Sequence, residues 1–138
     1  MPSLRFLPFV LLIAAAGCQS EPKTVAKEII VWKPVHKWAG RTNVQTESFP
    51  GESGSFQVHW ESKPFRESPP ASLTVTLHSA VSGRPLALVV EHQGAGKDVT
   101  VVGEDPREFF LVIEASGTEW TVELDEGIRA VKQEPVAN

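Results

Sequence analysis

The stretch SFQVHWE, residues 55–61, decides the fold class. Its apolar residues Phe56, Val58 and Trp60 alternate with polar ones, and this period of two is typical of a β-strand with one buried face. The stretch LTVTLH, residues 73–78, repeats the pattern and is followed by a Ser-Gly turn signal at residues 82–83. These segments predict strands, and no segment after Cys18 shows the 3.6-residue apolar period of a helix over three turns.

Strand-like patterns continue on both sides of these two segments. We expect further strands at EIIVW (28–32), LALVV (86–90), VTVV (99–102), EFFLVIE (108–114) and EWTVEL (119–124), and a weaker polar strand within 41–49. Residues 63–72 contain three prolines and predict a surface loop. Because a turn separates 108–114 from 119–124, these two strands predict a tight hairpin with an exposed acidic face. Seven to eight short strands with regular turns predict an all-β domain over residues 28–138, either a β-sandwich or a small barrel, and we expect a single antiparallel β-sandwich.

The N-terminus predicts export and lipidation. A short region with one charge, Arg5, precedes an apolar stretch that is too short to span a bilayer as a helix and fits the core of a signal peptide. The following residues, Ala15-Ala16-Gly17-Cys18, resemble the lipobox of bacterial lipoproteins, although the family usually has leucine where Ala15 stands. The resemblance implies a signal peptide over residues 1–17, acylation (diacylglycerol, palmitate) of the Cys18 thiol, and a lipidated tether over residues 18–27. An ordinary secretory signal is the alternative.

This anchor gives an expected location. Two or more acyl chains hold a protein firmly on a membrane without a transmembrane helix. The expected membrane partner is therefore engaged through lipidated Cys18, in the bacterial cell envelope. Gln19 is not the aspartate that resembles an inner-membrane retention signal, so we expect the outer membrane, facing the periplasm, with the cell surface as an alternative.

Composition limits the partners. Removal of residues 1–17 leaves 121 residues, enough for one domain, with a formal charge of −5. The chain contains no basic run, which argues against a nucleic-acid partner and offers no polybasic segment for anionic lipids. Cys18 is the only cysteine, so once it is acylated no disulfide is available and the apolar core alone must stabilise the domain. Gly-rich turns and a Trp-x-Val strand ending in acids make the last eighty or so residues similar to small exported β-sandwich modules of the CUB or jelly-roll kind, and an Ig-like arrangement is also open.

Three functions remain as hypotheses. The first is a non-enzymatic sandwich that binds or positions another envelope component, since no catalytic constellation and no cofactor motif is found. Ser79 follows His78 directly and so points to the other face of the strand, and GAGK (94–97) is expected to be a hairpin turn. The second is carbohydrate binding by exposed Trp32 and Trp38, which lie beside polar residues; burial of both at one end of the core is the alternative.

The third hypothesis is a metal-binding or hydrolytic site. It would need His59 and His78 to converge from neighbouring strands, with Glu61 or His92 completing the ligand shell. No close ligand spacing supports such a site, so no metal is expected.

Overall fold

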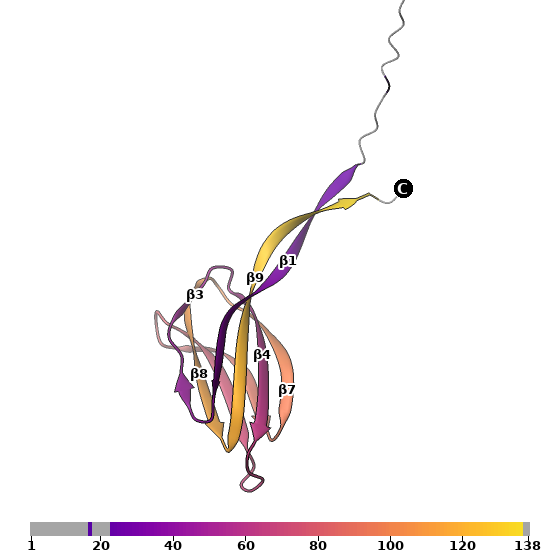
Figure 1. Cartoon of the computed structure of the whole chain (residues 1–138). Helices are drawn as coiled ribbons and strands as arrows, with labels where there is room; N and C mark the ends of the chain where they lie inside the picture. The colour runs from indigo at the N-terminus through magenta and orange to yellow at the C-terminus, as the bar shows by residue number, and fades with distance from the viewer. Residues whose placement is uncertain (1–16, 18–22, 137–138) are drawn as a thin grey trace, which may run out of the picture.

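The computed structural model describes residue 17 and residues 23–136, and in these ranges the chain forms nine strands and no helix. One sheet contains, in order, β1 (Thr24–Gly40), β9 (Thr118–Pro135), β4 (Ser55–Pro64) and β7 (Gly96–Gly103). The other contains β2 (Val44–Gln45), β8 (Arg107–Ser116), β5 (Ser72–Ser79) and β6 (Pro85–Gln93), and β3 (Phe49–Gly51) also pairs with β8. All strand pairs are antiparallel, and the two sheets pack as layers (Figure 1).

The predicted all-β antiparallel sandwich is therefore confirmed. The weak polar strand expected within 41–49 is divided into β2 and β3, which flank Thr46 and both pair with β8. This division accounts for the ninth strand of the described chain. The turn signal at residues 82–83 joins β5 to β6 in a hairpin, in which the N–H of Gly83 donates to the carbonyl oxygen of Ser79 at 2.7 Å.

Two expected hairpins are wrong. β8 and β9 follow each other closely through Gly117, but β8 pairs with β5 while β9 pairs with β1 and β4 in the opposite sheet. β6 and β7, joined across residues 94–95, likewise belong to different sheets. The physical reason is that a strand with one apolar face can bury it from either layer of a sandwich, so alternation alone does not distinguish a hairpin from a crossing between sheets. The expected acidic face on β9 is present, with Glu119 and Glu123 exposed.

The core lies between the two sheets and is made by the alternating residues of the central strands. Phe56, Val58 and Trp60 of β4 are 0–8% exposed, as their alternation predicts. β5 and β8 contribute the facing layer, in which the inward side chains of Leu73, Val75, Leu77, Phe109, Leu111 and Ile113 are 0–1% exposed. The most deeply buried large side chains are Trp120, Phe49, Phe56, Phe109, Leu73, Leu77, Leu111, Ile113 and Leu124.

A two-stranded ribbon projects from the sandwich (Figure 1). Residues 24–32 of β1 pair with residues 127–135 of β9, whereas β4 stops pairing with β9 at the Phe56–Glu126 pair. A β-bulge between Pro34 and His36 marks the point where β1 leaves the body. We call the paired segments 23–33 and 127–136 the ribbon. The last four residues of the segment expected to be a tether, 24–27, belong to it and are paired with β9.

Candidate functional site

The expected lipidation residue, Cys18, and almost all of the expected signal peptide lie outside the described residues. Within the described ranges there is no helix whose length and apolar character would let it cross a bilayer. The described chain resumes at Lys23, at the free end of the ribbon, where the backbone N–H of Val136 donates to the carbonyl oxygen of Lys23 at 3.0 Å. The N-terminal segment therefore enters the domain at the tip of the ribbon, away from the sandwich body (Figure 1).

Trp38, one of the two expected ligand-binding tryptophans, is half-buried at the edge of the core. Its ring stacks on His36 with a centroid separation of 5.3 Å and lies 5.8 Å from the ring of Phe49. Its indole N–H donates to the carboxylate of Glu47, with a nitrogen–oxygen distance of 3.2 Å. These contacts satisfy both the apolar ring and the polar N–H, which is the requirement of a structural tryptophan.

Trp32, the other expected ligand-binding residue, lies at the base of the ribbon. It is half-buried and pairs with Gly127, and a side chain at Gly127 would contact its ring. Trp38 pairs with Val122, five residues from Gly127 along β9. Since neighbouring residues of a strand point to opposite faces, Trp32 and Trp38 lie on opposite faces of the sheet. The structure does not bring them together as one stacking surface.

The histidines do not converge. His59 lies on β4, whereas His78 and His92 lie on β5 and β6 of the other sheet. The N–H of His78 donates to the carbonyl oxygen of Gly83 at 3.1 Å, and that of His92 to the carbonyl oxygen of Ala95 at 2.8 Å. No group of three His, Cys, Asp or Glu side chains in the described part of the chain is arranged to hold a metal ion.

Ser79 is buried, and its hydroxyl is hydrogen-bonded within the turn that follows β5. Its Oγ accepts from the backbone N–H groups of Val81 and Ser82 at 3.3 and 3.4 Å, while the ring of His78 stacks on Phe110 with a centroid separation of 4.9 Å. Both side chains therefore hold the β5–β6 turn, and the ring of His78 also packs on the outer surface of its sheet.

Sequence reasoning missed a polar row that crosses the outer face of the four-stranded sheet. Lys37 of β1, Glu123 of β9, His59 of β4 and Val99 of β7 stand opposite one another in register. The Nζ of Lys37 lies 2.8 Å from Oε1 of Glu123. His59 also contacts the neighbouring row: its Nε2–H donates to Oδ2 of Asp125 at 2.8 Å. The alternation of each strand indicated an outward position for these residues, but only the strand order brings them together.

The pairing changes the acid–base properties of this row. The hydrogen bond with the Lys37 ammonium, and then its charge, lower the pKa of the Glu123 carboxyl. The same hydrogen bond and the negative charge of Glu123 raise the pKa of Lys37. Both groups are therefore ionised throughout the neutral range, and the row presents one positive and one negative charge side by side.

A shallow hollow of about 540 Å³ lies beside this row. It is lined by the outward side chains of β4, β7 and β9, among them His59, Glu61, Lys97, Val99 and Thr121. Val99 gives the hollow an exposed apolar side chain on β7, and Val101, two residues further along the same strand, is also exposed. We call this surface the outer face: it combines charges of both signs with a small apolar border, a composition that suits a protein surface or a polar ligand.

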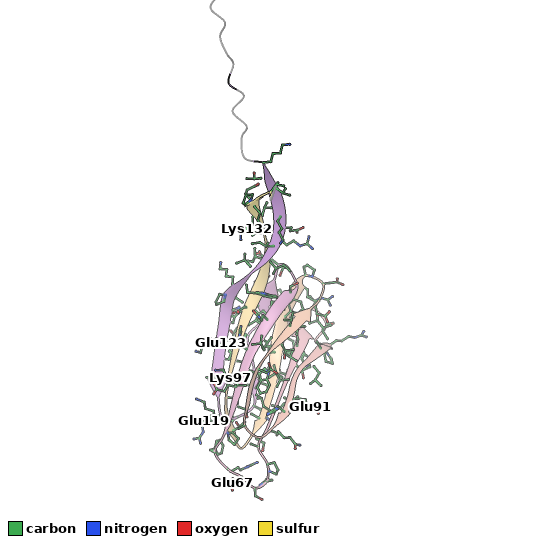
Figure 2. The ribbon with its side chains drawn as sticks, turned by 90° about the vertical axis from the view of Figure 1, so that its right-hand side faces the viewer. Glu67, Glu91, Lys97, Glu119, Glu123 and Lys132 are labelled. Atoms are coloured by element: carbon green, nitrogen blue, oxygen red, sulfur yellow. The ribbon has the colours of Figure 1, made fainter. Side chains whose placement is uncertain are left out.

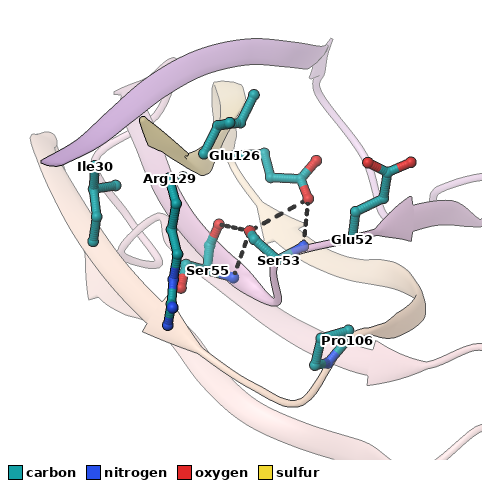
Figure 3. Close-up of a pocket in the computed structure, with 9 residues that line it drawn as sticks. Ile30, Glu52, Ser53, Ser55, Pro106, Glu126 and Arg129 are labelled. Carbon is teal, nitrogen blue, oxygen red and sulfur yellow. Dashed lines mark hydrogen bonds between the residues drawn. The ribbon is translucent and has the colours of Figure 1, made fainter. Parts of the chain in front are cut away.

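A second hollow, of about 510 Å³, lies at the neck where the ribbon leaves the body (Figure 3). Glu126 closes one side of it, and its carboxylate accepts hydrogen bonds from the backbone N–H and the hydroxyl of Ser53 at 3.0 and 3.4 Å. Ile30 and Arg129 of the ribbon line the other side. The Glu126 carboxylate holds the loop before β4 through these hydrogen bonds. We therefore interpret this hollow as the connection between the ribbon and the body.

Comparisons of the chain with protein-family models, with curated proteins and with solved structures found no match. No relative therefore supplies a function.

Proposed function

We propose that the protein is a lipid-anchored lipoprotein of the bacterial envelope, whose non-enzymatic β-sandwich binds or positions another envelope component. The observation that carries the proposal is the position of Cys18, which follows the apolar run of residues 6–17 and precedes β1 by six residues. Acylation at this residue would fix the tip of the ribbon to a membrane. Gln19 favours the outer membrane, with the sandwich facing the periplasm.

The ribbon suits such a protein because it acts as a spacer. Nine residue pairs at about 3.3 Å each give it a length of about 30 Å. The body lies beyond its far end, so a membrane at the ribbon tip would leave the outer face accessible to a partner. The outer face is the surface that we assign to binding, because its charged row is held in place by the Lys37–Glu123 and His59–Asp125 contacts.

The anchor is tested by replacing Cys18. We expect mass spectrometry of the wild-type N-terminal peptide to show an acylated cysteine and the protein to fractionate with membranes until detergent is added. The C18A variant should appear in the soluble fraction, while the control S20A stays with the membrane. An unmodified Cys18 peptide, or a C18A variant that remains on the membrane as the wild type does, would contradict the anchor.

The binding surface is tested with a photo-crosslinking amino acid placed at Val99 on the outer face. The matched control carries it at Leu88, which is exposed on β6 of the other sheet. We expect a discrete adduct in intact cells at Val99 that is absent at Leu88 and is lost when Lys37 and Lys97 are both replaced by glutamate. Equal adducts at the two positions, or none where known envelope assemblies are captured, would count against a partner on this face.

A further inference from the structure

The charge of the chain is divided between ribbon and body. The ribbon has five basic and two acidic residues, a net charge of +3, although the whole chain carries −4. Residues 34–126, the body, have seven basic and fourteen acidic residues, a net charge of −7. Figure 2 shows Lys132 on the ribbon, whereas Glu67, Glu91, Glu119 and Glu123 lie along the body. The sequence has no basic run because the ribbon lysines come from its two ends.

One face of the ribbon collects most of this positive charge. Lys27 and Lys132 are directly opposite each other in register, an arrangement of like charges that disfavours strand pairing. One carboxylate serves both: the Nζ atoms of Lys27 and Lys132 lie 4.0 and 3.9 Å from the two oxygens of Glu134. The two lysine side chains are largely exposed and Glu134 is half-buried, so the three groups together leave one net positive charge that faces solvent.

The same face is apolar around the lysines. Val25 and Val31 share it because they alternate with Lys27 along β1, and Ile128 shares it because it pairs with Val31. These three side chains are 54%, 46% and 43% exposed. We call the surface formed by Val25, Lys27, Val31, Ile128, Lys132 and Glu134 the lysine face. Aliphatic side chains beside solvent-facing lysines are the composition of a surface that rests in a lipid headgroup layer.

The position of the ribbon brings the lysine face close to a surface of opposite charge. Lys23 is five residues after Cys18, so an anchor at Cys18 keeps the ribbon tip within about 18 Å of the membrane. This length lets the ribbon tip reach the membrane surface, where an anionic bilayer attracts basic side chains that come within about 8–10 Å at physiological salt. The acidic body is repelled by the same surface.

We propose that the lysine face of the ribbon lies on the anionic phospholipid surface of the membrane in which the protein is anchored. This inference rests on the proposed lipid anchor and adds a second, electrostatic contact to it. The opposite face of the ribbon also exposes two aliphatic side chains, Ile30 and Val131. It lacks the net positive charge, because its charged pair, Glu28 and Arg129, is internally neutralised with an oxygen–nitrogen distance of 3.4 Å. A ribbon that lies along the membrane in this way separates the body from the anchor at Cys18 and also fixes the orientation of the body.

The test attaches residues 18–138 through the Cys18 thiol to a maleimide lipid, so that it does not depend on acylation in the cell. Vesicles contain phosphatidylcholine alone or phosphatidylcholine mixed with phosphatidylglycerol, and hydrogen–deuterium exchange is followed by mass spectrometry. We expect peptides covering 23–33 and 127–136 to exchange more slowly on the anionic vesicles, with no change in the β5–β6 turn. High salt should remove the difference.

Charge variants identify the face. In K27Q/K132Q the contact should weaken about 30-fold, which corresponds to about 1 kcal/mol for each lysine, and the protection should disappear. The matched control E28Q/R129Q removes a neutralised pair from the other face. It should keep the protection of the ribbon peptides. Equal exchange on both vesicles overturns the proposal, as does equal loss in the two variants; neither result bears on acylation of Cys18, which is measured separately in cells.

Discussion

Thr46 and Leu111 exchange two hydrogen bonds of 2.9 Å. The backbone N–H of Thr46 donates to the carbonyl oxygen of Leu111, and the N–H of Leu111 donates to Oγ1 of Thr46. The threonine hydroxyl in turn donates to the carbonyl oxygen of Glu47 at 2.9 Å. A side chain therefore stands in for a backbone acceptor in the gap between β2 and β3, where the edge of the second sheet is interrupted.

This exchange predicts that T46V is destabilising although valine has nearly the same shape. The N–H of Leu111, a residue that is fully buried, would lose its acceptor, and an orphaned buried donor costs about 1–3 kcal/mol. The free energy of unfolding, measured by urea titration, should fall by this amount. T46S keeps the hydroxyl and should lose less; a loss in T46S as large as in T46V would show that the hydroxyl is not the cause.

Gly51 ends β3 in contact with the aromatic part of the core. A Cβ atom at this position would overlap the rings of Phe109 and Phe56, both of which are fully buried. We expect G51A to lower the free energy of unfolding by about 1–3 kcal/mol, because overpacked rings leave their preferred rotamers. The control G103A has no heavy atom within 4 Å of the added carbon. Its melting temperature should stay close to that of the wild type, and similar losses in both variants would contradict this explanation.

The Lys37–Glu123 pair predicts a pH dependence at both ends of the scale. Because the folded-state pKa of Glu123 is lowered, its stabilising contribution is present above the unfolded-state pKa and is lost as the pH falls through the folded value. Because the pKa of Lys37 is raised, its contribution is present below the unfolded-state pKa and is lost as the pH rises through the folded value. Both side chains are exposed, so the effect should shrink in high salt.

NMR titration checks this pair directly. The midpoint of the Glu123 carboxyl should lie below that of an ordinary glutamate and move upward in K37Q. In the control K63Q, which removes a lysine that contacts Glu61 instead, the Glu123 midpoint should not move. A midpoint that is unchanged by K37Q would exclude the lysine as the cause.

The fold class could be predicted from the sequence because the alternation of apolar and polar residues is a local pattern, visible within a single strand. Phe56, Val58 and Trp60 are buried as their spacing predicts. The sheet to which a strand belongs was not predictable, since a strand with one apolar face fits either layer. For this reason β8 and β9 were predicted to form a hairpin, although they lie in different sheets.

The candidate surfaces were harder to predict for a related reason. The outer-face row joins Lys37, His59 and Glu123, which are 22 to 86 residues apart, and the ribbon lysines Lys27 and Lys132 are separated by most of the chain. Local spacing carries no information about such pairs. The length of β1 was missed, because the expected strand covered only residues 28–32, whereas the structure continues it past Pro34 at a bulge on a sheet edge.

The ribbon should open independently of the sandwich. None of the buried core residues lies in 24–33 or 128–135, and an isolated two-stranded ribbon is marginally stable in water. In solution, we expect the amides of residues 128–135 to exchange hydrogen through local opening with little dependence on urea. The amides of residues 120–124, on the same strand but within the body, should exchange only through global unfolding. Deletion of residues 128–138 should accordingly leave the free energy of unfolding of the body almost unchanged. If both parts of β9 exchanged with the same free energy, ribbon and sandwich would form one cooperative unit, and the neck at Glu126 would not be the joint that its contact with Ser53 indicates.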